Sequence, residues 1–236
     1  MEERKRYAKI DYRGNWNIGA FGVATDAFAI LGYGFREETI KKAENALHVP
    51  VIIPNVLFDS LVGSMMLANS NGILLPEKEV DEEDEKMLNE KLKKEALEIK
   101  VAKIDLSKNY NALGNLALCL DNLVVFPSEI MEQNKGSTSL IEDTMGAEVI
   151  GYDFSLNVPG SALVGTKRGI LAHPMINKDI LNALGNQLNI RIGRGSINFG
   201  SPWVGNGLIL NSHGFLAGNK TTGHEMAHIW RILYRR

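Results

Sequence analysis

Residues 63–75 have the sequence GSMMLANSNGILL, and this segment decides the fold. It opens with a glycine beside a small polar residue, Gly63-Ser64, and a second glycine, Gly72, follows nine positions later and begins the apolar run Ile73-Leu-Leu75. Two short apolar segments joined by a glycine-containing turn are typical of a β-hairpin. The segment therefore predicts two antiparallel strands.

The same pattern recurs along the whole chain. A glycine followed by a small or polar residue opens each copy, and successive copies are 44, 51, 46 and 45 residues apart: Gly19-Ala20, Gly63-Ser64, Gly114-Asn115, Gly160-Ser161 and Gly205-Asn206. The second glycine is present as Gly72, Gly169 and Gly214, whereas the first and third copies have Phe28 and Leu123 there, so their turns must differ. A period of this length indicates a repeat architecture.

Each predicted hairpin is followed by a predicted helix, and the first four helices are followed by a β-branched segment that predicts a third strand. The helices are predicted at residues 36–47, 81–96, 137–145, 177–188 and 222–233. The third strands are predicted at residues 49–56, 97–104, 147–154 and 189–197. The fifth unit lacks one because the chain ends after its helix.

Residues 6–12 precede the first copy and can supply the missing strand, which would close the array into a ring. The predicted fold class is therefore α/β (α+β), with five ββαβ repeats in a closed pseudo-fivefold β/α propeller that forms one domain. The repeats are expected at 13–58, 59–109, 110–156, 157–200 and 201–236, the last completed by residues 6–12. The alternative is an open α+β sheet with accidental spacing.

The composition excludes several classes of protein. With 236 residues, 44% of them hydrophobic, and a net charge of −2, the chain can bury a sizeable core and is not expected to be disordered. A pI of about 6.2 argues against general attraction to nucleic acid or membranes. No apolar run approaches the roughly 20 residues that span a bilayer, and the single cysteine, Cys119, fits a reducing compartment. A cytoplasmic location without membrane contact is expected.

Several segments resemble translation initiation factor 6, the archaeal and eukaryotic ribosome anti-association family. They occur in order along the chain: Ser60-Leu-Val-Gly-Ser64, Ala68-Asn-Ser-Asn-Gly-Ile-Leu-Leu-Pro76, Asn111-Ala-Leu-Gly-Asn115, Gly169-Ile-Leu-Ala-His-Pro174 and Asn198-Phe-Gly-Ser201 with Thr221-Thr-Gly223. The resemblance implies the pentein fold and a non-catalytic, archaeal-type factor without a cofactor. It also implies docking on the large ribosomal subunit, near the sarcin-ricin loop and neighbouring ribosomal proteins, which blocks the small subunit. A monomer is expected.

Six short polar side chains are the predicted ribosome-binding residues, because pseudo-symmetry is expected to gather them at one end of a rigid ring. They are Ser64, Asn69, Ser70, Asn115, Ser161 and Asn206. The resemblance favours Asn115 and Ser64 most. The alternative for each residue is that its side chain merely satisfies the backbone of a turn.

Two motifs support competing hypotheses. His224-Glu-Met-Ala-His228 has the H-E-x-x-H pattern of zinc hydrolases, which makes a metal-dependent hydrolase that uses His224, Glu225 and His228 the alternative function. No third ligand follows it in the chain, and only an upstream residue such as His213 remains, so a plain terminal helix and no metal site are expected. Cys119 matches the nucleophile type of pentein enzymes, but its apolar neighbours predict a buried, inert thiol.

A third hypothesis concerns basic residues at the two ends of the chain. Arg4, Lys5 and Arg6 would approach Arg231, Arg235 and Arg236 if the N-terminal strand lies beside the last helix. Such a group could contact phosphates. Solvated chain ends are the favoured interpretation.

Overall fold

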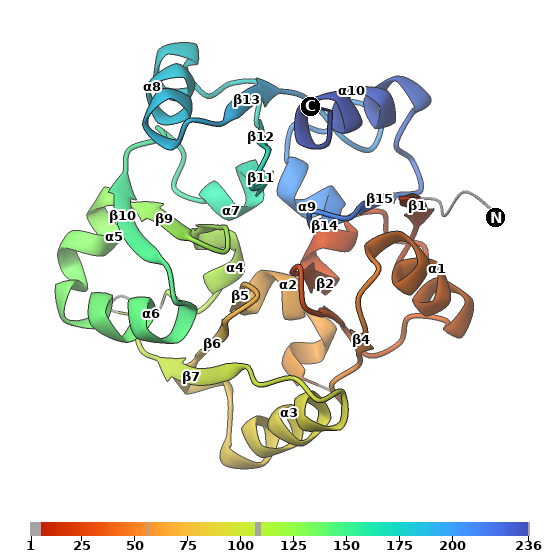
Figure 1. Ribbon diagram of the computed structural model, residues 1–236, viewed down its shortest axis with the longest axis vertical. Helices are drawn as coiled ribbons and strands as arrows, with labels where there is room; N and C mark the ends of the chain where they lie inside the picture. Colours follow the sequence, from red (N-terminus) through yellow and green to blue (C-terminus); the bar gives the residue numbers. More distant parts are fainter. Residues whose placement is uncertain (1–5, 56, 107–109, 236) are drawn as a thin grey trace.

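The computed structural model describes residues 6–55, 57–106 and 110–235, in which the strands form five three-stranded sheets around a common axis (Figure 1). In each sheet a hairpin of two antiparallel strands is joined by a third strand parallel to the second. The sheets are β2 (Gly22–Ala24), β3 (Ala29–Leu31) and β4 (Val51–Ile52); β5 (Leu67–Ala68), β6 (Gly72–Pro76) and β7 (Lys100–Ile104); β8 (Leu118–Cys119), β9 (Leu123–Pro127) and β10 (Glu148–Tyr152); β11 (Leu163–Thr166), β12 (Gly169–Ala172) and β13 (Arg191–Arg194); β14 (Leu208–Leu210), β15 (Phe215–Gly218) and β1 (Tyr7–Ile10).

The last sheet closes the ring with the first strand of the chain. β1 pairs in parallel with β15, so that Tyr7 lies opposite Phe215 and Ile10 opposite Gly218. This is the strand that the fifth unit lacks in its own sequence. The predicted closed ring of five repeats is confirmed, and the open sheet is wrong.

The five long helices lie on the outside of the ring and match the predicted segments closely (Figure 1). They are α1 (Glu37–Leu47), α3 (Glu82–Lys94), α6 (Thr138–Met145), α8 (Lys178–Leu188) and α10 (Gly223–Leu233). Each begins one residue after its predicted start, because that first residue is the N-cap. In three helices the cap side chain accepts a backbone N–H from the first turn: Asp81, Asn177 and Thr222. A further helix, α5 (Ser128–Gln133), was not predicted.

The repeated glycines lie in one-turn helices that precede the hairpins, rather than opening a strand as the sequence pattern suggested. These helices are η1 (Ile18–Phe21), α2 (Val62–Met65), α4 (Leu113–Leu116), α7 (Pro159–Ala162) and α9 (Val204–Gly207). A Cβ atom on each repeated glycine would come closer than 3.0 Å to the carbonyl oxygen of the repeated glycine in the preceding unit. The contacts run from Gly205 through Gly19 to Gly63, and on around the ring through Gly114 and Gly160. Glycine is needed because neighbouring backbones touch there.

The hydrophobic core is divided into five clusters, each shared by two neighbouring sheets. The second strands show how. In β6, Ile73 and Leu75 pack in one cluster, whereas Leu74, on the other face, packs in the next. A strand buried on both faces is expected to be apolar at every position, as these strands are.

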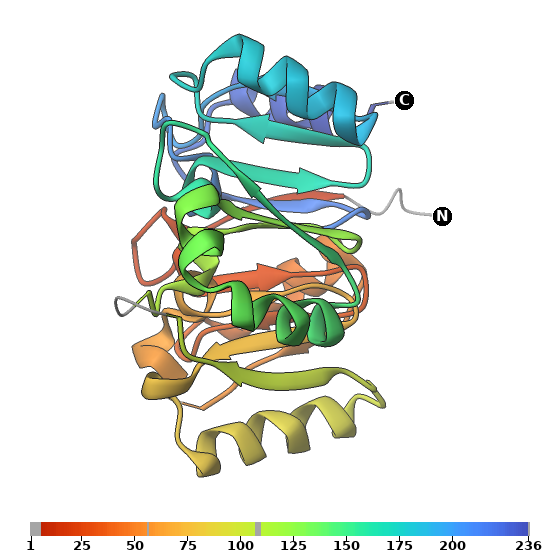
Figure 2. The ribbon, with the colours of Figure 1, turned by 90° about the vertical axis from the view of Figure 1, so that its left-hand side faces the viewer.

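The ring has two distinct ends, because the first strand of every hairpin runs away from its short helix (Figure 2). We call them the short-helix end, which holds η1, α2, α4, α7 and α9, and the hairpin-turn end, which holds the five turns between first and second strands. The second and third strands also finish at the short-helix end. Along the axis, a cavity of about 120 Å³ is lined by the repeated glycines, and one of about 270 Å³ lies beneath the hairpin turns.

Gly114→Ala is expected to lower the free energy of unfolding by about 3 kcal/mol, since the new methyl group would overlap the backbone of Gly63, which cannot move aside as a side chain can. Urea unfolding followed by circular dichroism measures this. Gly223→Ala is the matched control, because nothing lies within 4 Å of a Cβ placed there. Equal stability of the Gly114→Ala protein and the wild type would contradict the packing argument.

Candidate functional site

Four of the six predicted binding residues lie together at the short-helix end. Ser64, Asn115, Ser161 and Asn206 each follow a repeated glycine in a one-turn helix, so the pseudo-symmetry places them around the axis. The Ser161 hydroxyl donates a hydrogen bond to Asn115 Oδ1 at 3.2 Å. Ser161 is only 6% exposed, and the other three residues are half-buried, on a frame that is fixed by backbone packing.

Asn69 and Ser70 lie at the opposite, hairpin-turn end, because β5 separates them from Ser64. The prediction that all six residues share one surface is therefore wrong for these two. Asn69 is only 2% exposed; its Oδ1 accepts the N–H groups of Asn71 and Gly72, and its Nδ2 donates to the carbonyl of Met145 in the next unit at 2.8 Å. Asn69 thus closes its own turn and links two units.

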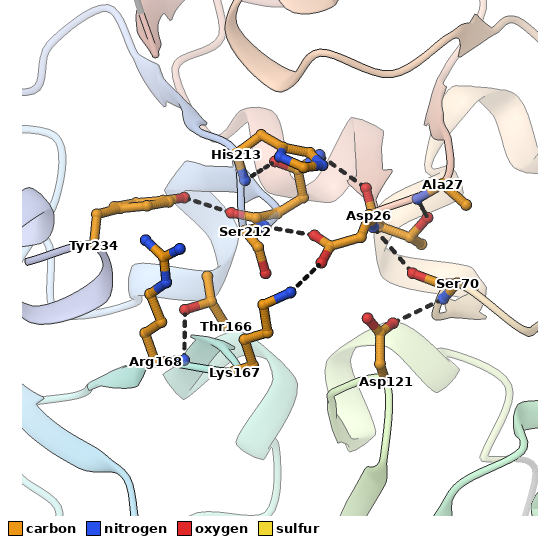
Figure 3. A network of polar contacts seen from close by, with 12 residues as sticks. Asp26, Ala27, Ser70, Asp121, Thr166, Lys167, Arg168, Ser212, His213 and Tyr234 are labelled. Atoms are coloured by element: carbon orange, nitrogen blue, oxygen red, sulfur yellow. Dashed lines mark hydrogen bonds and ion pairs between the residues drawn. The ribbon is translucent and has the colours of Figure 1, made fainter. Parts of the chain in front are cut away.

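The hairpin-turn end carries a polar network that surrounds the axis (Figure 3). Ser212 N–H donates to Asp26 Oδ1, Asp26 N–H donates to Ser70 Oγ, and Ser70 N–H donates to Asp121 Oδ1. The Lys167 ammonium lies 3.4 Å from Asp26 Oδ2. Burial raises the pKa of Asp26, but hydrogen bonds from Ser212 and the charge of Lys167 outweigh it and leave the pKa below its usual value. The network joins units rather than presenting reactive groups.

Cys119 lines the cavity beneath these turns but is not an activated nucleophile. Burial raises the pKa of its thiol well above the ordinary value, and the Asp121 carboxylate raises it further. Because the thiolate is the reactive form, this environment keeps the sulfur inert at neutral pH.

Large exposed apolar side chains gather at the short-helix end. Within the described residues such side chains are Trp16, Tyr33, Leu61, Met175 and Phe199 at this end, and Tyr7 and Leu140 elsewhere. All five follow the end of a strand or precede a short helix. The exposed apolar side chains of the described residues are therefore concentrated at one end of the ring.

The most exposed aromatic residue of this end is held in a strained loop. Phe199 is 81% exposed, and both Asn198 and Phe199 have left-handed backbone conformations, with φ of 53° and 63°. The N–H groups of Phe199 and Gly200 donate to the Glu225 carboxylate at 3.1 and 2.9 Å. The Asn198 side chain donates to the carbonyl of Trp16 at 2.9 Å. Strain retained in this way is typical of functional loops.

Glu225 is the glutamate of the H-E-x-x-H pattern, and its contacts give that residue a structural role. It forms a capping box with Thr222 at the start of α10, and it also accepts the hydroxyl of Ser196 at 2.9 Å. His228 Nε2 lies 2.8 Å from the carbonyl oxygen of Arg194. Across the described residues, no group of three His, Cys, Asp or Glu side chains is arranged to hold a metal ion. The geometry gives the hydrolase hypothesis no support.

The hydrogen bonds to Glu225 also fix its charge. Burial raises its pKa, but donors from the backbones of Thr222 and Gly200 and the hydroxyls of Ser196 and Thr222 outweigh that effect, so the pKa is lowered. The carboxylate is therefore ionised at neutral pH.

The basic residues of the predicted phosphate-binding group are only partly described. Arg6 immediately precedes β1, whereas Arg231 and Arg235 lie at the end of α10 and just after it. The Arg191 guanidinium donates hydrogen bonds to the backbone carbonyls of Arg231 and Arg235, at 2.9 and 3.4 Å. Arg4, Lys5 and Arg236 lie outside the described residues. Convergence of these residues on a phosphate stays a prediction.

Five three-stranded sheets closed around an axis define a pentein-like β/α propeller. A crystal structure of a dimethylarginine dimethylaminohydrolase has a similar fold, with a TM-score of 0.50 over 78% of this chain and 71% of that chain. The two sequences are 13% identical, so the likeness concerns the fold alone.

The chain belongs to the eIF-6 family, whose model matches residues 7–232. Translation initiation factor 6 of Methanocaldococcus jannaschii is 35% identical over 211 residues, which cover 89% of this chain and 90% of that protein. Translation initiation factor 6 of Staphylothermus marinus is 33% identical over 226 residues, 95% and 96% of the two chains. The resemblance predicted from the sequence is confirmed, and the relatives are translation factors.

No helix in the described part of the chain has the length and apolar character needed to cross a bilayer.

Glu225→Gln is expected to lower the free energy of unfolding by about 2 kcal/mol at pH 7, because a buried acceptor of several donors loses its charge. The pKa of Glu225 is lower in the folded chain, so its contribution is complete above the unfolded pKa and disappears as the pH falls through the folded pKa. The stability difference between wild type and variant should therefore shrink below about pH 4.3. Urea unfolding between pH 7 and pH 3 measures it, and a constant difference would contradict the assignment.

Proposed function

We propose that the protein binds the large ribosomal subunit through its short-helix end and prevents association with the small subunit. Membership of the eIF-6 family supports a role in translation initiation. The single observation that carries the choice of surface is that five of the seven large exposed apolar side chains of the described residues lie at that end, which also holds Asn115 and Ser161. The surface would lie against ribosomal proteins and RNA near the sarcin-ricin loop.

The proposed mechanism is occupancy without chemistry. A bound ring would fill the space that the small subunit needs, so activity would depend on affinity, shape and regulated release. A rigid frame favours this role, because the binding groups lose little conformational freedom when they dock. In this proposal the protein acts as a cytoplasmic monomer, needs no cofactor, and serves initiation or assembly of the large subunit.

Sedimentation of purified archaeal subunits tests this proposal. A stoichiometric amount of the protein should co-sediment with the large subunit and reduce the fraction of joined ribosomes in a sucrose gradient. Joining that proceeds unchanged in its presence, together with absence of the protein from the large-subunit peak, would exclude the function.

Phe199→Ala is expected to weaken binding to the large subunit about tenfold, because it removes an aromatic side chain that the isolated chain leaves exposed. The melting temperature should stay within about 1 °C, since little of the chain packs on that ring. Leu140→Ala, which changes an exposed apolar residue of α6 away from this end, is the control and should bind as the wild type does. Unchanged affinity of the Phe199→Ala protein would show that Phe199 is not part of the ribosome-binding surface.

Asn115→Ala is expected to weaken subunit binding by about 1 to 2 kcal/mol if the amide contacts the partner. Ser161→Ala is the matched control, because it breaks the same Ser161 to Asn115 hydrogen bond and keeps the amide, and because Ser161 itself is only 6% exposed and offers a partner little contact. Binding constants come from co-sedimentation titrations and stability from thermal unfolding. An equal loss of affinity in both variants would assign the effect to the hydrogen bond rather than to contact by Asn115.

A further inference from the structure

The perimeter of the ring contains a groove of about 930 Å³ between α1 and α10, with β1 at its base. Figure 1 shows β1 between these two helices, on the outside of the ring. The groove is lined by Tyr7, Lys9, Lys42, Met226 and Trp230, among others. Tyr7 is 49% exposed, and its ring meets the Trp230 ring edge to face at 6.4 Å. The walls are therefore apolar, with ammonium groups beside them.

Comparison among the repeats identifies Lys9 as the unusual residue of this groove. The strand register makes Lys9, Lys103 and Arg194 equivalent, since they lie opposite Ala217, Leu75 and Ala172 of the second strands. Lys103 forms an ion pair of 3.0 Å with Glu85, and Arg194 donates to the carbonyl of Pro174 at 3.2 Å. The Lys9 side chain forms no hydrogen bond or ion pair with any of residues 6–55, 57–106 and 110–235.

The missing partner follows from one position in the helix sequence. Glu85 is the fourth residue after the N-cap Asp81 of α3, and the fourth residue after the N-cap Thr222 of α10 is Met226. The same position holds Ile40, Ile141 and Leu181 in the other helices, so the α3 unit alone has a carboxylate there, and the α10 unit has a thioether. The described residues therefore offer Lys9 no carboxylate, and its ammonium group lies beside an apolar wall.

We propose that this groove binds a peptide segment of a partner protein in which a carboxylate side chain lies next to an aromatic or aliphatic one. The carboxylate would pair with Lys9, as Glu85 pairs with Lys103, and the apolar side chain would cover Tyr7, Met226 and Trp230. Lys42 already pairs with Glu38 at 2.6 Å, so Lys9 supplies the charge that no residue of the described part of the chain pairs. The groove lies on the perimeter, so this interaction stands independently of docking by the short-helix end.

Selection from a library of short random peptides displayed on phage, with the full chain as target, tests the proposal. Enriched peptides should contain Asp or Glu beside an apolar residue. Fluorescence anisotropy of the labelled peptides should show a Kd at least about tenfold higher for Lys9→Met and Met226→Glu than for wild type. Met226→Glu recreates the internal ion pair of the α3 unit and closes the site. Lys178→Met, at an exposed lysine of α8, is the matched control and should bind normally.

A charge reversal separates recognition from structural damage. Lys9→Glu should lose the acidic peptides and bind the same peptides with Lys in place of Asp or Glu, and thermal unfolding should confirm that the variants are folded. Failure to enrich any peptide, or equal binding by wild type and Met226→Glu, would overturn the proposal. Binding that emerges only after removal of residues 1–5 would mean that the chain itself fills the groove, which would overturn the assignment to a separate partner. Subunit binding by Lys9→Met should equal that of wild type.

Discussion

The contact of five glycine backbones around the axis is the constraint on which the rest of the structure depends. At each of Gly19, Gly63, Gly114, Gly160 and Gly205, the position of a Cβ atom is occupied by a neighbouring carbonyl oxygen. This approach sets the distance between neighbouring units, and therefore how deeply the faces of neighbouring sheets interpenetrate. A side chain at any one of these positions would separate two units and disturb the cores on both sides of the ring.

Closure follows from the way the cores are shared. Because each cluster is built from two neighbouring units, a unit at the end of an open array would leave one apolar face in water. Tyr7–Ile10 completes the last sheet, and Ile10 joins the cluster that contains Ile18, Leu31 and Leu216. The interaction that seals the ring thus joins residues more than 200 positions apart in the sequence. Burial of both faces of β15 is its driving force.

Much of the fold could be predicted from the sequence because its signals are periodic, and less of the site could be, because its signals are not. The glycine spacing and the five helices recur at regular intervals, and the closing strand could be predicted because the last repeat lacks its third strand. The one-turn helices were missed, since four residues carry no helical period. Asn69 was misplaced because short polar residues such as Asn are typical both of turns and of binding surfaces. The capping-box pattern of Thr222 and Glu225 could have explained the H-E-x-x-H motif, whereas nothing in the sequence showed that Phe199 is exposed.

The candidate surfaces of this protein are formed by side chains that the ring leaves exposed, beside the repeated positions that hold the units together. The repeated glycines and the apolar second strands are alike in every unit, and they hold the ring together. Phe199 is the most exposed aromatic side chain of the described residues, in a left-handed loop whose counterparts include Arg13 and Phe58. At the fourth position after the helix N-cap, Glu85 is the departure, because the other units have Ile40, Ile141, Leu181 and Met226. Lys103 has Glu85 to pair with, whereas the equivalent position beside Lys9 is the apolar Met226. The two proposed surfaces, one at the short-helix end and one on the perimeter, would allow one rigid ring to contact two partners at once.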